Sequence, residues 1–263
     1  MHRHPSSLPP SPARRTLLLG ALLGCAAGAS APALAFPWPF GGETVEGRGN
    51  VSRQERRVAN FSGISFSLPG KLELRIGDRE GITVETEDNL QELIETVVED
   101  GMLRIRPARR NLNLRTRNLH IVVNARRIER LALGGSGSIE SDPLRGSRLD
   151  IDIGGSGRID LRGIEAERLS ASVGGSGDLR CGGGKLRRLS VSVAGSGKVD
   201  LGRVEAREAS VNIAGSGDVT LWAQQELKAS IAGSGDIGYY GDPRVSHSAA
   251  GSGRVRQLGS APR

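Results

Sequence analysis

Three aspartates are the best candidates for catalytic residues in this sequence, by their type and spacing. Asp150, Asp152 and Asp160 form a close set of carboxylates on strand-like segments. Enzymes that cleave polysaccharides use a pair of carboxylates, one as the acid and one as the nucleophile or base. Aromatic residues, which could stack on sugar rings, make up only 3% of the chain. We therefore predict a non-enzymatic interaction module, and keep a polysaccharide-cleaving enzyme that uses these aspartates as the alternative.

Other catalytic and ligand-binding chemistries lack residues that they need. A serine nucleophile needs a base, and beyond the first 35 residues the chain has only His120 and His247, neither beside a nucleophile-elbow sequence. The Gly-rich stretch 182–185 lacks the first glycine and the Ser or Thr of a P-loop. Gly-Ser-Gly-Asp segments such as 175–178 resemble calcium-binding repeats, but basic residues at the Asp position of other repeats would repel the ion. We expect no catalytic residue, cofactor or metal.

Basic residues gather between positions 104 and 130, where nine arginines accompany a single acid, Glu129. Such a stretch either is a solvated face or contacts an anionic envelope polymer such as lipopolysaccharide. Without residues 1–35 the chain has 33 basic and 29 acidic residues, a net charge of +4. That balance argues against nucleic acid as a partner. The candidate contacts to an anionic polymer are Arg104, Arg106, Arg109, Arg110, Arg115 and Arg117.

Residues 1–35 are typical of a secretory signal peptide. They contain two adjacent arginines, an apolar run and a final Ala-x-Ala motif, without any acidic residue. We predict cleavage after Ala35; the alternative is that Leu22-Leu23-Gly24-Cys25 is a lipobox and that Cys25 carries a lipid anchor. Both the general and the twin-arginine secretion routes stay open. We expect an exported protein of the periplasm or outer cell envelope, with no transmembrane helix after the leader.

Gly-Ser-Gly recurs seven times, and this repeat indicates the fold. The central serines are 20 residues apart up to Ser216 and 18 residues apart afterwards. A fixed period in this range indicates a repeat architecture, and alternation of apolar and polar residues around each turn indicates strands. A propeller blade would need about 40 residues. We therefore predict an all-β solenoid of about seven coils, each of 18–20 residues, whose turns are centred on Ser136, Ser156, Ser176, Ser196, Ser216, Ser234 and Ser252.

Equivalent positions of the repeats predict which side chains point inward. Val193 before the turn and Val199 after it belong to two apolar columns. Cys181 shares the inward column of Leu161, so we interpret it as a buried filler. The glycines beside each serine permit positive φ angles and a close approach between coils.

Outward positions carry charges that largely alternate in sign from one repeat to the next. Alternation of this kind predicts ladders of ion pairs on the surface. One such column is Ser138, Arg158, Asp178, Lys198, Asp218, Asp236 and Arg254, and a second is Glu140, Asp160, Arg180 and Asp200.

The patterns divide the chain into five segments. We predict a signal peptide at 1–35, a flexible tether at 36–49, an N-terminal β segment that starts and caps the solenoid at 50–130, the repeats at 131–258 and a tail at 259–263. Polar or small residues at inward positions, including His247 and Gln257, predict that the last coil is incomplete. Within 50–130 we expect a short helical turn at 89–94 and strands at 62–68, 71–76, 82–87, 102–106 and 119–123.

The repeats, the leader and two local motifs together resemble a known bacterial family. The motifs are Phe61-Ser62-Gly63-Ile64 and Glu99-Asp100-Gly101-Met102-Leu103-Arg104-Ile105. From about residue 50 to 255, the chain resembles the auto-transporter adhesin, head GIN domain family. The resemblance implies a right-handed parallel β-helix, an exported location and an adhesin-like function. We expect an envelope polysaccharide or a protein as the partner. It implies no catalytic motif.

Overall fold

The structure, a computed structural model, describes residues 42–262 of the chain. It contains 21 strands and one short 3-10 helix, which agrees with the predicted all-β class. The predicted signal peptide at 1–35, Cys25 and the first part of the predicted tether lie outside the described residues.

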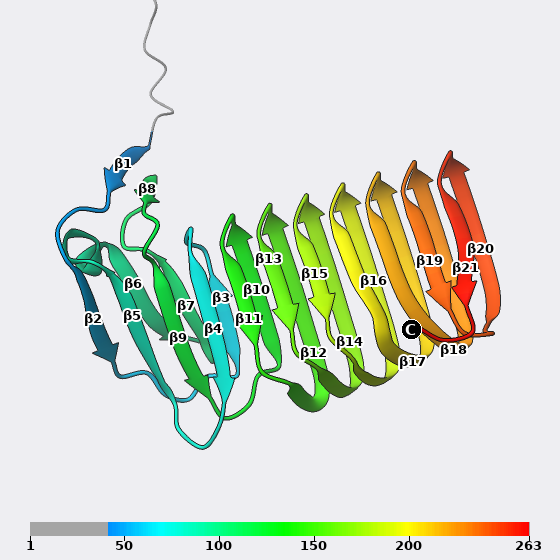
Figure 1. Cartoon of the computed structure of the whole chain (residues 1–263), viewed down its shortest axis with the longest axis horizontal. Helices are drawn as coiled ribbons and strands as arrows, with labels where there is room; N and C mark the ends of the chain where they lie inside the picture. Colours follow the sequence, from blue (N-terminus) through cyan, green and yellow to red (C-terminus); the bar gives the residue numbers. More distant parts are fainter. Residues whose placement is uncertain (1–41, 263) are drawn as a thin grey trace, which may run out of the picture. The chain divides into compact units, whose positions relative to one another are not determined.

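The repeats fold as a parallel β-solenoid, as predicted. In a typical coil a long strand bends once, passes through a Gly-Ser-Gly turn and continues as a short strand (Figure 1). The bend falls at Ser147 in β12 (Leu144–Gly155) and at Glu167 in β14 (Ile164–Gly175). These two residues are the ones skipped in the otherwise regular pairing of the two strands. The solenoid strands are β10 (Arg130–Gly135), β11 (Ser138–Ser141), β12 (Leu144–Gly155), β13 (Arg158–Leu161), β14 (Ile164–Gly175), β15 (Asp178–Cys181), β16 (Gly184–Gly195), β17 (Lys198–Gly215), β18 (Asp218–Gly233), β19 (Asp236–Tyr240), β20 (Arg244–Gly251) and β21 (Arg254–Gly259).

The solenoid makes about six turns, against the seven predicted from the seven Gly-Ser-Gly motifs. The difference has a simple geometric reason. Successive serines from Ser136 to Ser252 are each one circuit of the chain apart, so seven turn motifs enclose six full circuits.

The core consists of the inward columns that the repeat pattern predicted. Val193 pairs in register with Val173 of the preceding coil and with Ile213 of the next, and all three are 2% exposed. Val199 lies on the other side of the turn and is also 2% exposed. Cys181 is a buried free cysteine, as expected, and burial raises the pKa of its thiol.

The first glycine of each Gly-Ser-Gly motif has a conformation that other residues avoid. Gly155 has a φ of 112° and Gly175 a φ of 100°. A Cβ atom on Gly175 would also lie 2.6 Å from the carbonyl oxygen of Gly155 in the preceding coil. Both the positive φ and the close approach therefore require glycine here, as predicted.

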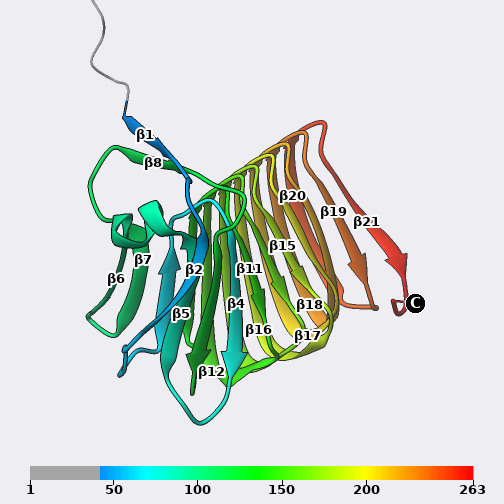
Figure 2. The same ribbon diagram turned by 60° about the vertical axis from the view of Figure 1, so that its left-hand side comes forward.

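The N-terminal segment starts the solenoid and closes its first edge. Strands β3 and β4 pair in parallel with β10 and β11, and β7 and β9 pair in parallel on the other side of β3 and β4. Beyond them, β6 pairs antiparallel with β7, and β5 pairs antiparallel with both β9 and β2 (Figure 2). Because these strands run antiparallel to their neighbours, the parallel stacking of coils stops at this end of the solenoid. The elements are β2 (Val51–Arg56), β3 (Gly63–Phe66), β4 (Lys71–Ile76), β5 (Gly81–Glu87), η1 (Asp88–Leu93), β6 (Ile94–Glu99), β7 (Met102–Pro107), β8 (Leu112–Arg115) and β9 (His120–Ala125).

Part of the predicted flexible tether is a strand instead. β1 (Glu43–Glu46) pairs in parallel with β8, outside the main sheet. Its Val45 packs against the core, and this contact gives an otherwise polar segment a reason to become ordered. Sequence reasoning also missed β2, β6 and β8, which are short, and of which β2 is mostly polar. Such strands depend on their pairing partners.

The last coil is open to solvent. Every residue of β20 is exposed or half-buried, including His247 and Ala249 at positions that are inward in other coils. Gln257 stands where earlier coils have leucine, and its side chain donates to the carbonyl oxygen of Gly241 at 2.7 Å. The incomplete last coil that the sequence predicted is therefore present.

Candidate functional site

The three aspartates of the enzyme alternative do not form one site. Asp150 and Asp152 lie on β12, whereas Asp160 lies on β13, beyond the Gly-Ser-Gly turn. The carboxylate of Asp150 accepts from Arg148 Nε at 2.9 Å, and this hydrogen bond raises the pKa of Arg148. Asp152 is exposed and pairs in register with Ser172 of the next coil. Asp160 lines a separate groove that neither of the other two reaches.

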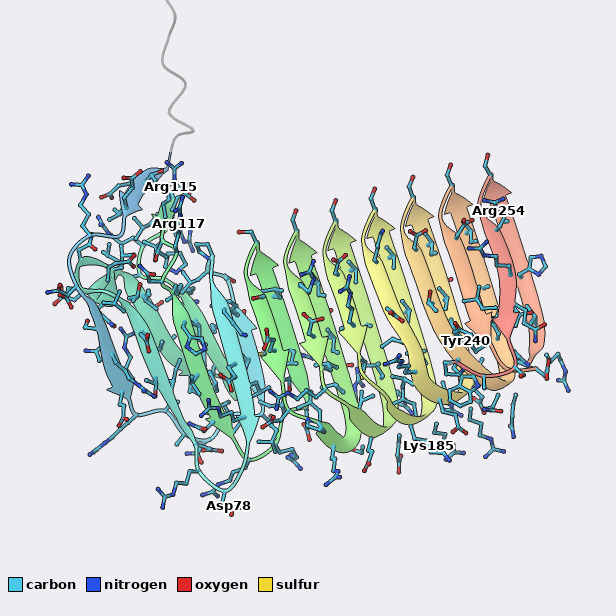
Figure 3. The ribbon with its side chains drawn as sticks, in the orientation of Figure 1. Asp78, Arg115, Arg117, Lys185, Tyr240 and Arg254 are labelled. Atoms are coloured by element: carbon cyan, nitrogen blue, oxygen red, sulfur yellow. The ribbon has the colours of Figure 1, made fainter. Side chains whose placement is uncertain are left out.

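Most of the arginines proposed to contact an anionic polymer are engaged in ion pairs. Four of the six arginines are paired: Arg104 with Glu99 at 2.7 Å, Arg106 with Glu95 at 2.6 Å and Glu99 at 3.2 Å, Arg109 with Glu43 at 3.3 Å and Arg115 with Glu46 at 3.4 Å. Arg110 and Arg117 are exposed, and within residues 42–262 neither has a carboxylate within 4.0 Å. Figure 3 shows Arg115 and Arg117 together at the N-terminal segment. An anionic contact in this region would therefore depend mainly on Arg110 and Arg117.

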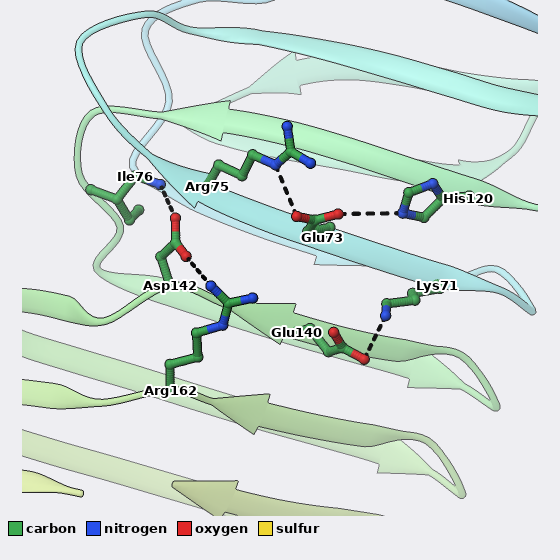
Figure 4. A network of polar contacts seen from close by, with 8 residues as sticks. All are labelled: Lys71, Glu73, Arg75, Ile76, His120, Glu140, Asp142 and Arg162. Carbon is green, nitrogen blue, oxygen red and sulfur yellow. Dashed lines mark hydrogen bonds and ion pairs between the residues drawn. The ribbon is translucent and has the colours of Figure 1, made fainter. Parts of the chain in front are cut away.

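A polar network joins the N-terminal segment to the first repeat (Figure 4). Glu73 accepts from Arg75 Nε at 2.9 Å and lies 3.6 Å from His120 Nε2, and the hydrogen bond from Arg75 lowers the pKa of Glu73. Across the junction, Lys71 Nζ lies 2.7 Å from Glu140 Oε1. Each of these carboxylates has a cationic partner, so the network is suited to fastening β4 to β11 rather than to catalysis.

The serines of the seven turns point to solvent. All seven are exposed, and the backbone N–H of Ser196 donates to the carbonyl oxygen of Gly175 at 2.8 Å. The same backbone bond from Ser176 to Gly155 measures 2.9 Å. The main chain therefore holds the turns together, and the hydroxyl groups form an exposed polar row along one edge of the stack.

An open groove of about 1030 Å³ lies near the C-terminal end. One wall is the chain from Leu258 to Pro262, which lies beside strands of much earlier coils. The other wall includes Asp160, Arg180 and Asp200. Tyr240, labelled in Figure 3, also lines it.

Asp160, Arg180 and Asp200 form one row across three coils. They pair in register, as the predicted charge column requires. However, no ion pair within 4.0 Å joins them, although Arg158 and Asp178 of the neighbouring column do pair, with Nη2 donating to Oδ2 at 3.1 Å. Of the predicted ion-pair ladder, the first column therefore has only the pairs Arg158–Asp178 and Arg254–Asp236, and this part of the second column has none. The polar groups of this row face the groove and are available to a ligand.

Sequence reasoning missed the groove as a whole, although it named Asp160 as a catalytic candidate and placed Asp160, Arg180 and Asp200 in one column of charges. The repeat pattern places Arg180 and Asp200 in its column, so the row was visible in the sequence. The position of Tyr240 and of the tail beside that row was not, because neither is part of the repeat pattern.

No helix among residues 42–262 has the length and apolar character needed to cross a bilayer. Over the same residues, no group of three or more His, Cys, Asp or Glu side chains is placed to hold a metal ion.

Solved structures show the same fold in other bacterial proteins. A putative lipid-binding protein from Parabacteroides distasonis is 31% identical in sequence, with a TM-score of 0.70 over 82% of this chain and 100% of the other. A putative adhesin from Bacteroides fragilis is 21% identical, with a TM-score of 0.77 over 81% of this chain and 100% of the other. A putative adhesin from Parabacteroides merdae is 19% identical, with a TM-score of 0.67 over 82% and 99%.

The sequence itself matches one protein family and no curated protein. The family model, described as "putative auto-transporter adhesin, head GIN domain", matches residues 60–243, which include most of the repeats and most of the segment that starts them. With that match and the 31% identity to a structure of the same fold, the chain belongs to the auto-transporter adhesin, head GIN domain family.

Proposed function

We propose that this protein is an exported, non-enzymatic envelope module that binds a glycan in the groove between the row Asp160, Arg180, Asp200 and the C-terminal tail. The observation that carries the proposal is that this row lines an open groove of about 1030 Å³ without internal ion pairs. A groove of about 1030 Å³ is large enough for several sugar units.

The charges of the groove favour a neutral polar ligand. Its lining contains two aspartates, Asp160 and Asp200, and two arginines, Arg180 and Arg203. These charges balance, so the groove as a whole attracts neither anions nor cations strongly. Sugar hydroxyl groups can both donate to carboxylates and accept from guanidinium groups. The half-buried Tyr240 adds an amphipathic ring at the end of the row.

The same row supports binding rather than cleavage. Asp160 and Asp200 lie two strands apart, and two strand spacings amount to about 10 Å. That separation is at the upper limit of the distance between the two carboxylates of an inverting glycosidase. Arg180 stands in register between them, in the space that the sugar and the attacking water would need. The relatives described as adhesins or as a lipid-binding protein agree with a binding role.

Export and surface location are also part of the proposal. They are supported by the leader pattern at 1–35 and by membership of a family described as auto-transporter adhesins. The similarity of this chain to a putative lipid-binding protein suggests lipid as a second class of ligand. The four charged side chains in the groove favour the glycan over an acyl chain, because an acyl chain would bury them without hydrogen-bond partners.

The test is a binding screen of the purified full chain against neutral envelope-type oligosaccharides, followed by calorimetry. We expect Asp200→Asn and Tyr240→Ala each to weaken binding about ten-fold, because each removes one direct contact from a shared site. Arg145→Ala is the matched control, since Arg145 is exposed on another column and paired with Glu165 at 3.1 Å. Binding that survives both groove substitutions, or turnover of the glycan that Asp160→Asn abolishes, would refute the proposal.

A further inference from the structure

Three arginines of successive coils face one another at the bend of the long strands. Arg148 on β12 pairs in register with Arg168 on β14, which pairs in register with Arg188 on β16. Like charges directly opposite each other on neighbouring strands are destabilising. The row therefore differs from the neighbouring column of Arg158 and Asp178, where opposite charges meet.

Only the two outer members of the row are neutralised. Arg148 pairs with Asp150 at 2.9 Å, and Arg188 pairs with Glu208 at 3.1 Å. The central Arg168 has no carboxylate within 4.0 Å in the described part of the chain, and neither has the adjacent Arg187. Both are exposed. The middle of the row thus has two cations that the protein itself leaves without an anionic partner.

These arginines surround a hollow of about 220 Å³. Its lining is Ser147, Glu167 and the four arginines Arg148, Arg168, Arg187 and Arg188. Because Asp150 and Glu208 already neutralise Arg148 and Arg188, the two unpaired arginines oppose one carboxylate. At about 30 Å³ per water molecule, the hollow has room for a sulfate or phosphate group and several waters. Guanidinium groups donate pairs of parallel hydrogen bonds to such oxyanions.

The hollow continues in both directions along the stack. Arg148 also lines a second hollow, of about 160 Å³, on the side of the N-terminal segment. Arg168 and Arg188 also line a third, of about 200 Å³, which includes the hydroxyl groups of Ser190 and Ser210. Both flanking hollows contain acidic as well as basic side chains, so only the central one has a clear excess of positive charge. This arrangement suits a chain-like ligand with an anionic group in the middle and hydroxyl groups on either side.

We propose that the hollow around Arg168 and Arg187 is a binding site for a sulfate or phosphate group carried by a glycan strand that lies along the solenoid axis. The ester oxygens accept from Arg168 and Arg187, and a neighbouring sugar hydroxyl donates to Glu167. The site shares no lining residue with the groove near Tyr240, so it goes beyond the proposed glycan site and does not depend on it.

The test measures the affinity of the purified full chain for a dextran sulfate oligomer, with uncharged dextran of equal length as the reference. We expect dextran sulfate to bind and uncharged dextran not to bind. The double variant Arg168→Gln, Arg187→Gln should weaken binding at least ten-fold, because it removes the two unpaired guanidinium groups. Arg168→Lys, which keeps the charge but loses the planar donor pair, should retain part of the affinity.

The matched control is Arg53→Gln, Arg57→Gln, which removes two equally unpaired and exposed arginines of the N-terminal segment that are not among the candidate contacts to an anionic polymer. We expect this variant to bind like the unsubstituted chain, with an unchanged circular-dichroism spectrum in both variants. Equal losses in the two double variants would mean unspecific attraction and would overturn the site. A loss only in the control would move the contact to the N-terminal arginines and overturn it as well. Binding to phosphatidylglycerol vesicles without binding to dextran sulfate would overturn the glycan as its source.

Discussion

Val193 pairs in register with Val173 of the preceding coil, and each side chain is 2% exposed. The same stacking repeats for each inward column, so a single side chain contributes to the core of three coils at once. A polar change in such a column has no route to solvent, because the coils above and below enclose it.

We expect Val193→Asp to destabilise the protein strongly. The substitution would place an unpaired carboxylate in the core, at a cost of about 3 to 5 kcal/mol in the free energy of unfolding. Ser196→Ala is the matched control in the same coil, and its exposed side chain should change that free energy by less than about 0.5 kcal/mol. Urea denaturation followed by circular dichroism measures both. A Val193→Asp protein as stable as the control would show that the register is wrong.

Glu87 should make stability depend on pH in the acid range. It is 6% exposed and accepts hydrogen bonds from Thr116 at 2.7 Å, Asn118 at 2.9 Å and Thr86 at 3.0 Å. Burial raises the pKa of its carboxyl group, but the hydrogen bonds outweigh burial and lower it overall. Because the pKa in the folded state lies below the unfolded value of about 4.3, the stabilisation is fully present above that pH and is lost as the pH falls through the folded pKa.

We therefore expect Glu87→Gln to lower the free energy of unfolding by about 1 to 3 kcal/mol at pH 7. The difference from the unsubstituted protein should shrink between about pH 5 and pH 3. Denaturation curves at several pH values measure this, with Glu92→Gln as an exposed control on η1. A difference that stayed constant down to pH 3 would contradict the assigned role of the hydrogen bonds.

The last coil should open more readily than the middle of the stack. β20 is exposed or half-buried throughout and pairs only with β18, whereas β14 pairs with a strand on each side. Hydrogen exchange followed by mass spectrometry should show that peptides from 244–259 exchange well before peptides from 164–195. Equal protection of the two regions would mean that something covers the last coil in solution.

Calcium should have no effect on folding. Each Asp residue that follows a Gly-Ser-Gly turn stands in register with a basic residue on at least one side, as in the pairs Arg158 with Asp178 and Asp178 with Lys198. Asp218 and Asp236 face each other, but Lys198 and Arg254 flank them. A cation between these strands would be repelled by the basic neighbour. We expect the thermal midpoint in millimolar calcium to equal that in chelator. A calcium-dependent rise in the midpoint would restore the comparison with calcium-binding repeats.

The sequence by itself determined the repeats of this protein. In a parallel solenoid each residue stacks on its equivalent one period away, so the spacing of Gly-Ser-Gly motifs directly predicts which residues become neighbours. Val193, Val173 and Cys181 could be placed in the core for this reason, and Gly155 and Gly175 could be assigned positive φ angles because the turn needs them.

Only the tertiary structure decided the features that lie outside the period. The pairing of β1 with β8 and the antiparallel strands that close the first edge join segments with no repeat in common. Register alone also could not say which charges pair, since Arg158 and Asp178 meet, whereas Arg180 remains apart from Asp160 and Asp200 in an equivalent register. The groove exists because the chain after Leu258 returns to the side of coils formed much earlier, and that contact depends on the folded stack rather than on any local pattern.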